Sequence, residues 1–212
     1  MAHELEIKLA LPVRLAAQLR RLPLLAGVAG QKRGMGDLYL DTPEQALRHR
    51  RMALRRRTAG GENYLTLKTE GENANGFSRR QEWEYPLLSD ALDFSPIDDA
   101  QIRRFLQRAA SRLFPVFRTD FVRQTWGLPY GDSRVELALD LGHIRAGGWR
   151  ARISEVELEL LAGREADLFR LAETLMETLP LRPFSFSKAA RGYALLDAGV
   201  NRAAHGVESG LS

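Results

Sequence analysis

The sequence contains no cysteine, which excludes disulfide bonds and any thiolate metal site and favours a reducing compartment, the cytoplasm. No apolar run approaches the roughly 18 residues of a membrane span, and an acidic stretch rather than a signal peptide follows Met1, so we expect no membrane association. The four histidines are isolated from one another, and no Gly-x-x-x-x-Gly-Lys loop or legible Ser/His/Asp arrangement occurs. Zinc, P-loop and serine-nucleophile chemistry are therefore not expected.

What is present is typical of a globular protein: 212 residues, 44% of them hydrophobic and 27% charged. This length suffices for one sizeable core. We expect one domain over residues 1–198, followed by a flexible tail or linker over residues 199–212, where the chain is small and polar. The net charge of +4 indicates an anionic partner, which could be a nucleic acid, a phosphorylated metabolite or a membrane surface.

Alternating polar and apolar residues predict about eight strands joined consecutively by hairpins, which makes the fold class antiparallel α+β. Helical spacing predicts helices over residues 11–22 and 168–179, with a further short helix over 187–196. Helix-start signals are present at Thr42-Pro43-Glu44-Gln45, a capping box, and at Ser95-Pro96. The predicted strands cover residues 3–9, 31–41, 52–58, 63–68, 77–85, 115–127, 133–146 and 149–161.

The first predicted strand has one ionic and one aliphatic face. Side chains alternate along a strand, so Glu4, Glu6 and Lys8 share a face opposite Leu5 and its aliphatic neighbours. In an ordinary half-buried strand such a charged face simply meets water, but here the pattern recurs. Charged or polar residues in phase on later strands are Arg55 and Arg57; Thr66 and Lys68; Arg80, Glu82 and Glu84; Glu136 and Asp140; and Glu155, Glu157 and Glu159.

The apolar faces must be covered, and the helices are the available covers. If the sheet curls with its helices outside, the ionic faces point inward. Because burying unpaired ions costs several kcal/mol each, such an interior must be a wet channel that holds a charged ligand. Carboxylates without cysteine favour a hard ion, Mg2+ or Mn2+, whereas arginine and lysine suit phosphate oxygens. Together they indicate a metal-bound polyphosphate.

The sequence also resembles the CYTH superfamily, the triphosphate tunnel metalloenzymes, whose Glu-x-Glu-x-Lys signature matches Glu4 to Lys8. Within that superfamily it is most similar to bacterial inorganic triphosphatases in which a helical CHAD domain follows CYTH, leaving open whether this chain is truncated before such a domain. Further matching motifs are Tyr39-Leu40-Asp41-Thr42, Leu54-Arg55-Arg56-Arg57, Leu65-Thr66-Leu67-Lys68, Arg80-Gln81-Glu82-Trp83-Glu84, Glu136 with Asp140, Glu155-Val156-Glu157-Leu158-Glu159 and Ser187-Lys188-Ala189-Ala190-Arg191-Gly192-Tyr193.

The resemblance implies an eight-stranded antiparallel barrel, helices packed outside, with triphosphate bound along its axis. It assigns metal binding to Glu4, Glu6, Glu157 and Glu159, with Glu82, Glu84 and Asp140 as weaker candidates. It assigns phosphate binding to Lys8, Arg55, Arg57, Lys68, Arg80 and Arg123, with Lys188 and Arg191 closing one end. Arg118 and Arg123 have opposite strand phase, so only one faces inward without a bulge, and we favour Arg123.

The expected activity is metal-dependent hydrolysis of inorganic triphosphate to diphosphate and phosphate. Glu6 would hold the metal, while a second metal or a base such as Lys8 orients the attacking water. Two alternatives stay open: another enzyme of the fold, a class IV adenylyl cyclase or thiamine triphosphatase, and a non-catalytic polyphosphate or RNA binding module. Nucleic acid is not the expected partner of a tunnel enzyme.

Overall fold

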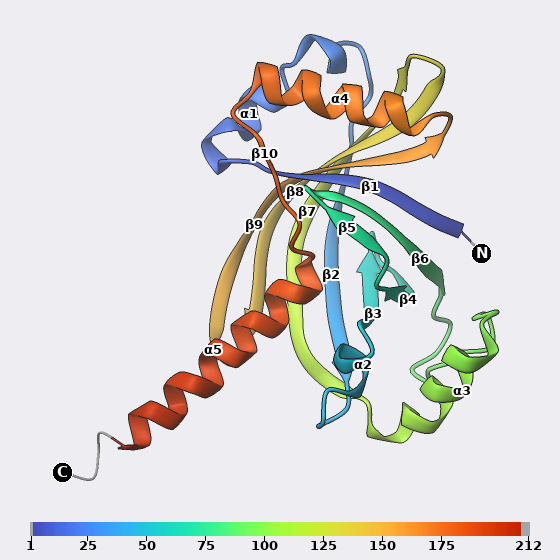
Figure 1. Cartoon of the computed structure of the whole chain (residues 1–212), viewed down its shortest axis with the longest axis vertical. Coiled ribbons are helices and arrows are strands. Elements are labelled where there is room, and N and C mark those ends of the chain that lie inside the picture. The colour runs from blue at the N-terminus through green and yellow to red at the C-terminus, as the bar shows by residue number, and fades with distance from the viewer. Residues whose placement is uncertain (1, 209–212) are drawn as a thin grey trace.

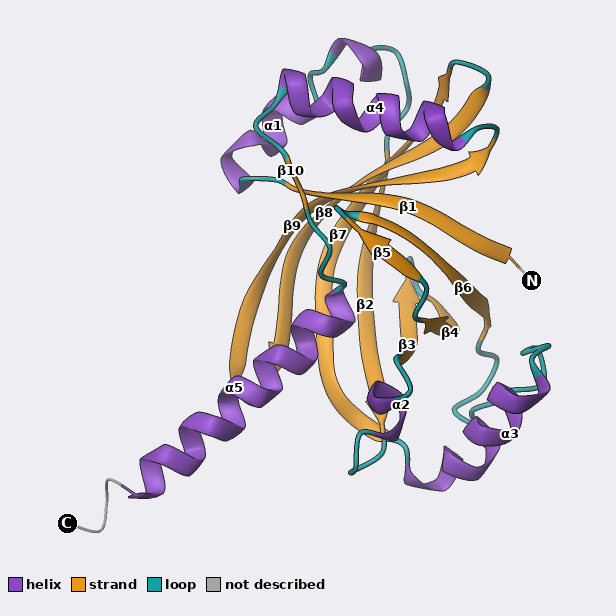
Figure 2. Ribbon diagram, in the orientation of Figure 1, coloured by secondary structure: helices purple, strands orange, loops and turns teal. Residues whose placement is uncertain are grey.

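The dominant element of the computed structural model, which describes residues 2–208, is an antiparallel sheet that closes on itself (Figures 1 and 2). Strand β1 pairs with β9 on one side and with β6 on the other, so eight strands form a closed barrel in the order β1-β9-β8-β7-β2-β3-β4-β6. This confirms the predicted eight-stranded antiparallel barrel, but the prediction that consecutive hairpins join all of the strands is wrong, because, among the described strands, β1 does not pair with β2 and β6 does not pair with β7. Its strands are β1 (Ala2–Ala10), β2 (Gln31–Asp41), β3 (Met52–Ala59), β4 (Glu62–Thr69), β6 (Phe77–Pro86), β7 (Phe114–Tyr130), β8 (Ser133–Ala146) and β9 (Trp149–Ala162); the short β5 (Glu72–Ala74) and β10 (Arg182–Pro183) lie at the margins.

Two groups of helices cover the apolar outer faces of the barrel. Helices α1 (Ala16–Leu19) and α4 (Glu165–Thr178) lie over β1, β8 and β9 at one end of the barrel (Figure 1). Their leucines pack against the outer face of these strands. On another side, Leu106 of α3 (Ala100–Ala109) packs against outward-facing residues of β3, β4 and β6. Each fully buried leucine side chain contributes about 1.5–3 kcal/mol, so these covers stabilise the apolar-out orientation of the strands. The polar faces consequently point inward.

Helix α5 (Lys188–Glu208) packs differently, against the inner face of the sheet where β7, β8 and β9 extend past the barrel. Tyr193 contacts the ring of Phe117 edge-on, and Ile144 and Ile153 lie in the same apolar cluster. The first turn of α5 therefore covers one end of the barrel. The helix continues beyond residue 196 to Glu208, through most of the predicted tail or linker; the domain boundary at 198 stays a prediction, and residues 209–212 lie outside the described part of the chain.

Three helix starts differ from the sequence predictions. Instead of one helix over residues 11–22, the structure has a 3-10 turn over Val13–Leu15 followed by the single α-helical turn of α1. A second 3-10 turn, Pro23–Leu25, comes after it. Helix α2 (Ala46–His49) begins after Gln45, whose φ of 55° is left-handed, so the predicted capping box at 42–45 is wrong. Helix α3 begins with Asp99 as its N-cap instead of at Ser95-Pro96, because the Asp99 carboxylate accepts hydrogen bonds from the backbone N–H groups of Gln101 and Ile102. A further 3-10 turn, Ala110–Arg112, follows α3.

Asp41, at the end of β2, caps α2 together with Thr42, whose hydroxyl accepts a hydrogen bond from the backbone N–H of Ala46 at 3.1 Å. The buried Asp41 carboxylate accepts hydrogen bonds from the backbone N–H groups of Leu47 and Arg48 at 2.9 and 3.1 Å. It also accepts a hydrogen bond from the hydroxyl of Tyr193 at 2.6 Å. One carboxylate thus caps α2 and anchors α5. None of the described helices combines the length and apolar character that crossing a membrane requires.

Candidate active site

Sheet register brings glutamates from three strands into one row inside the barrel. Glu6 of β1 lies opposite Glu159 of β9, and Glu159 lies opposite Glu136 of β8. One step along the strands, Lys8 lies opposite Glu157, with 3.2 Å between its ammonium and the carboxylate. All of these side chains line one cavity of about 1090 Å³. The cavity is large enough to hold a chain of several phosphates with its counter-ions.

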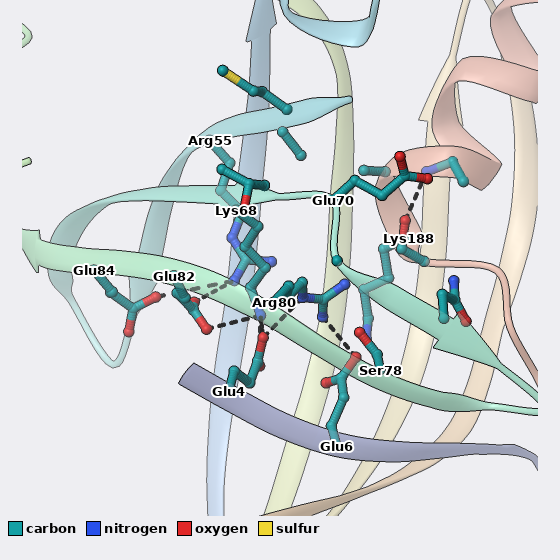
Figure 3. A pocket seen from close by; sticks show the side chains of 18 of the residues that line it. Glu4, Glu6, Arg55, Lys68, Glu70, Ser78, Arg80, Glu82, Glu84 and Lys188 are labelled. Carbon is teal, nitrogen blue, oxygen red and sulfur yellow. Dashed lines mark hydrogen bonds and ion pairs between the residues drawn. The ribbon is translucent and has the colours of Figure 1, made fainter. Parts of the chain in front are cut away.

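A second group, from β1, β4 and β6, forms a network at the cavity wall (Figure 3). The Lys68 ammonium donates to both carboxylate oxygens of Glu4, at 2.7 and 2.8 Å, and lies 3.0 Å from Glu82. Arg80 donates to Glu4 at 2.9 Å and to Glu6 at 2.6 Å, so it bridges the two glutamates of the first strand (Figure 3). Burial alone would lower the pKa of Arg80, but Glu6 and Glu4 outweigh it and raise that pKa. The guanidinium stays charged.

Asp37 of β2 organises the arginines of β3. Its buried carboxylate accepts from Arg57 Nε at 2.8 Å, from Arg55 Nη1 at 3.1 Å and from the Thr119 hydroxyl at 3.3 Å. Burial would raise the pKa of Asp37, but the two arginines hold it well below the usual range. Arg55 Nε is buried without a hydrogen-bond partner, the sole such side-chain atom among the described residues. Arg55 lines the cavity, and its unpaired donor is suited to an anionic ligand.

At the α5 end, Lys188 occupies a nest of three carboxylates. Asp140, Glu155 and Glu157 have oxygens within 4.8 Å of one another, and the Lys188 ammonium donates to all three, at 2.7 Å to Asp140 and 2.9 Å to Glu157. Arg191 donates to Glu155 at 2.9 Å. Lys188 and Arg191 already occupy these carboxylates, so the group is less available to a metal ion than its spacing suggests.

Glu159 and Glu136 form no hydrogen bond or ion pair among the described residues. Burial, together with repulsion from Glu4, Glu82 and Glu136, raises the pKa of Glu159 to about 7. Burial also raises the pKa of Glu136. An acidic pair that lacks a cation, next to Glu4 and Glu6, is the part of the cavity that best fits a hard metal ion.

Counting formal charges shows what this interior can accept. Among the described residues, the ion network holds eight cations and ten carboxylates, which leaves two negative charges. A phosphate chain would add several more. Binding it in this partly desolvated interior therefore requires divalent cations.

All of the predicted site residues except Asp140 and Arg191 line this cavity, and these two belong to the ion pairs around Lys188; the roles of all of them stay predictions. Arg123 points inward and donates to Asp140 and Glu157, whereas Arg118 is 59% exposed and pairs with Asp120 on the outside. Sequence reasoning did not assign Asp37, Glu136 or Glu155. Glu136 and Glu155 were in phase with assigned residues, but Asp37 stands alone in an otherwise uncharged run, and no sequence signal marked it.

This fold and interior define the class of protein: an antiparallel β-barrel with a charged tunnel. The chain belongs to the CYTH domain family, whose model matches residues 2–193. Membership of this family of triphosphate tunnel metalloenzymes implies a divalent metal, which fits the unpaired carboxylates.

Among characterised relatives, the chain is 37% identical over 199 residues to a protein of Haemophilus influenzae named inorganic triphosphatase; the match covers 92% of this chain but only about half, 55%, of that relative. Solved structures share the fold. One is HpAC1 from Hippeastrum, a proposed adenylyl cyclase described as having a dominant triphosphatase activity, with a TM-score of 0.64 and 21% identity over 90% of this chain and 95% of that one. Another is a proposed adenylate cyclase from Bacillus halodurans, with a TM-score of 0.54 and 18% identity over 88% and 96% of the two chains.

Proposed function

We propose that this chain hydrolyses inorganic triphosphate to diphosphate and phosphate inside the tunnel, in a reaction that requires Mg2+ or Mn2+. The observation that carries the proposal is the interior itself: cations suited to phosphate oxygens line the same cavity as two carboxylates, Glu136 and Glu159, that form no ion pair among the described residues. The name of the Haemophilus influenzae relative supports inorganic triphosphate as the substrate. The tunnel chemistry uses only the phosphates, which such a substrate supplies without an organic group.

Glu4, Glu6, Glu157 and Glu159 would hold the metal, with Glu82, Glu84 and Asp140 as weaker candidates. Glu159 fits this role best, because its carboxylate has no basic partner and is crowded by other acids. Asp140 and Glu157 fit it least in the present network, since Asp140 already pairs with Arg123 and Lys188, and Glu157 pairs with both of these and with Lys8. A bound divalent ion supplies neutralisation of phosphate charge and a position for water.

The basic residues of the tunnel would bind and orient the phosphate chain. Arg55 and Arg57 are held side by side by Asp37, and the free Nε–H of Arg55 offers a donor to a phosphate oxygen. The other proposed phosphate ligands are Lys8, Lys68, Arg80 and Arg123, with Lys188 and Arg191 closing the α5 end. Phosphate oxygens would compete with the carboxylates that these residues now contact, so binding loosens part of the network.

Lys8 lies between two of the proposed metal ligands, 3.5 Å from Glu6 and 3.2 Å from Glu157. Burial would lower its pKa, but Glu6 and Glu157 outweigh burial and raise it. Lys8 therefore stays an ammonium at neutral pH, able to donate a hydrogen bond to the attacking water or to a phosphate oxygen but not to accept a proton. In-line attack then depends on position and charge.

The test is phosphate release from tripolyphosphate, ATP and thiamine triphosphate, measured side by side with Mg2+, with Mn2+ and with chelator. We expect metal-dependent release from tripolyphosphate to exceed release from the other two. Faster release from ATP or thiamine triphosphate would contradict the proposed substrate. Absence of release from all three, with tripolyphosphate still bound, would contradict the proposed catalysis and leave a binding module.

A further inference from the structure

The outer face of β7, β8 and β9 changes character along its length. Under α4 the outward positions are apolar, as with Leu137 and Leu158, and they are buried. Toward the other end of the same strands the outward positions carry Arg118, Arg145 and Arg150, here called the outer arginine row. No helix covers this stretch within the described part of the chain: Arg118 and Arg145 are 59% and 58% exposed, and the nearby Val122 is 50% exposed.

Register aligns the three arginines directly. Arg118 of β7 lies opposite Arg145 of β8, which lies opposite Arg150 of β9. Because neighbouring strands are about 4.8 Å apart, the row spans about 10 Å. Like charges placed directly opposite each other destabilise a sheet. The row therefore costs stability unless an anion occupies it.

Among the described residues, Asp120 is the carboxylate that pairs with this row. Asp120 pairs with Arg118 and lies 3.8 Å from Arg145. Arg150 forms no ion pair or side-chain hydrogen bond with any described residue. The row also borders a groove of about 350 Å³, which is lined by the three arginines together with Leu38, Pro115 and the Gly147-Gly148 turn.

The distribution of charge points the same way. The interior network is acidic by two charges, whereas the whole chain carries +4, so the residues outside that network carry an excess of six positive charges. The tunnel therefore does not account for the basic character of the chain. The outer face of β7, β8 and β9 is therefore suited to the anionic partner that the positive net charge indicates.

We propose that the outer arginine row is a second anion site, which binds a linear inorganic polyphosphate chain lying across β7, β8 and β9. Guanidinium groups bind phosphate oxygens in bidentate pairs, and three in line match a repeating phosphate chain. Single-stranded nucleic acid sites add aromatic platforms for the bases. The aromatic side chains of this groove, Phe117 and Trp149, alternate with Arg118 and Arg150 along their strands and so point to the opposite face of the sheet. Phe117 is buried, and Trp149, 41% exposed, has ring atoms 2.9 and 3.0 Å from where a Cβ on Gly199 of α5 would stand. A chain without bases is therefore the better match.

The experiment measures binding of long-chain inorganic polyphosphate, in chelator, to the whole protein and to the double variant Arg145→Gln/Arg150→Gln. The matched control is Arg21→Gln/Arg108→Gln, which removes two exposed arginines from other surfaces and changes the net charge equally. We expect the row variant to bind about tenfold more weakly, with the slope of log affinity against log salt reduced by about 1.4, or about 0.7 per lost phosphate contact. The control variant should bind like the wild type, because any contribution of the tunnel is common to all three proteins.

Two outcomes would overturn the proposal. If the row variant and the control variant bind polyphosphate equally well, the outer arginine row is not a polyphosphate site. The wild type is also tested with a single-stranded RNA that has the same number of phosphates. If this RNA binds as tightly as polyphosphate, and if the row variant loses that binding, the partner is a nucleic acid. Tripolyphosphate hydrolysis is assayed on the same samples: it should be unchanged in the row variant, and its absence from every sample would contradict the proposed function without touching the outer site. A thermal midpoint within about 2 °C of wild type shows that each variant is folded.

Discussion

Replacing Asp37 tests whether one buried carboxylate organises the tunnel wall. Asp37→Ala would leave Arg55 and Arg57, each with a side chain only 9% exposed, without their shared acceptor. Removing one partner from a buried ion pair costs about 3–5 kcal/mol. Because Glu84 remains 3.3 Å from Arg57, we expect the low end, about 3 kcal/mol. For a chain of this size, that lowers the thermal midpoint by about 6–12 °C.

The conservative variant separates charge from shape. Asp37→Asn keeps one carbonyl oxygen in place, so we expect a smaller loss of stability than for alanine and partial recovery of the KM for tripolyphosphate, which should rise about tenfold in the alanine variant. The matched control is Asp120→Asn on the outer face of β7. That aspartate pairs with an exposed arginine, so its loss should change stability by less than about 1 kcal/mol.

The stability that Asp37 contributes changes with pH in a direction that follows from its pKa shift. The pKa of Asp37 is lowered in the folded protein, so its contribution to stability is present above the ordinary aspartate pKa of about 4 and is lost progressively as pH falls below that value. The difference in denaturant midpoint between wild type and Asp37→Asn should therefore be full at pH 7 and shrink below about pH 4. A pH-independent difference, or an alanine variant with unchanged thermal midpoint and KM, would refute the reasoning.

Three further predictions concern the tunnel and its closure. Glu6→Gln should abolish metal-dependent phosphate release in a protein that still folds, although the loss of the buried partner of Arg80 and Lys8 lowers the thermal midpoint; near-normal release would defeat the assignment of Glu6. Tripolyphosphate at a hundredfold excess over its Kd should stabilise the folded state by about 2.7 kcal/mol, and the absence of any thermal shift would count against a ligand-filled tunnel. Tyr193→Phe removes a buried hydrogen bond to the Asp41 carboxylate and should cost about 1.5–3 kcal/mol in denaturant titrations; an unchanged midpoint would show that α5 is anchored by packing alone.

Local patterns in the chain predicted most of the barrel because they reflect local physics. Alternation along residues 3–9 and 154–160 put every glutamate of those strands on one face, and the structure places those faces inward. Strand phase also placed Arg123 and Arg118 on opposite faces, and the structure decided that Arg123 is the one that faces inward. Helix starts were predicted less well, because Asp41 and Gln45 help to set the beginning of α2 through backbone geometry that a capping motif does not encode.

The sequence by itself therefore determined which side chains face inward, the antiparallel architecture and the chemistry of the interior. Only the tertiary structure decided which charges meet. Contacts such as Asp37 with Arg55 and Arg57, or Lys188 among three carboxylates, join positions 18 to 48 residues apart and depend on the pairing partner and register of each strand. The same is true of the outer arginine row, whose members belong to three strands. Register is set by the closure of the whole sheet and not by any one strand, so no local pattern could specify these neighbours.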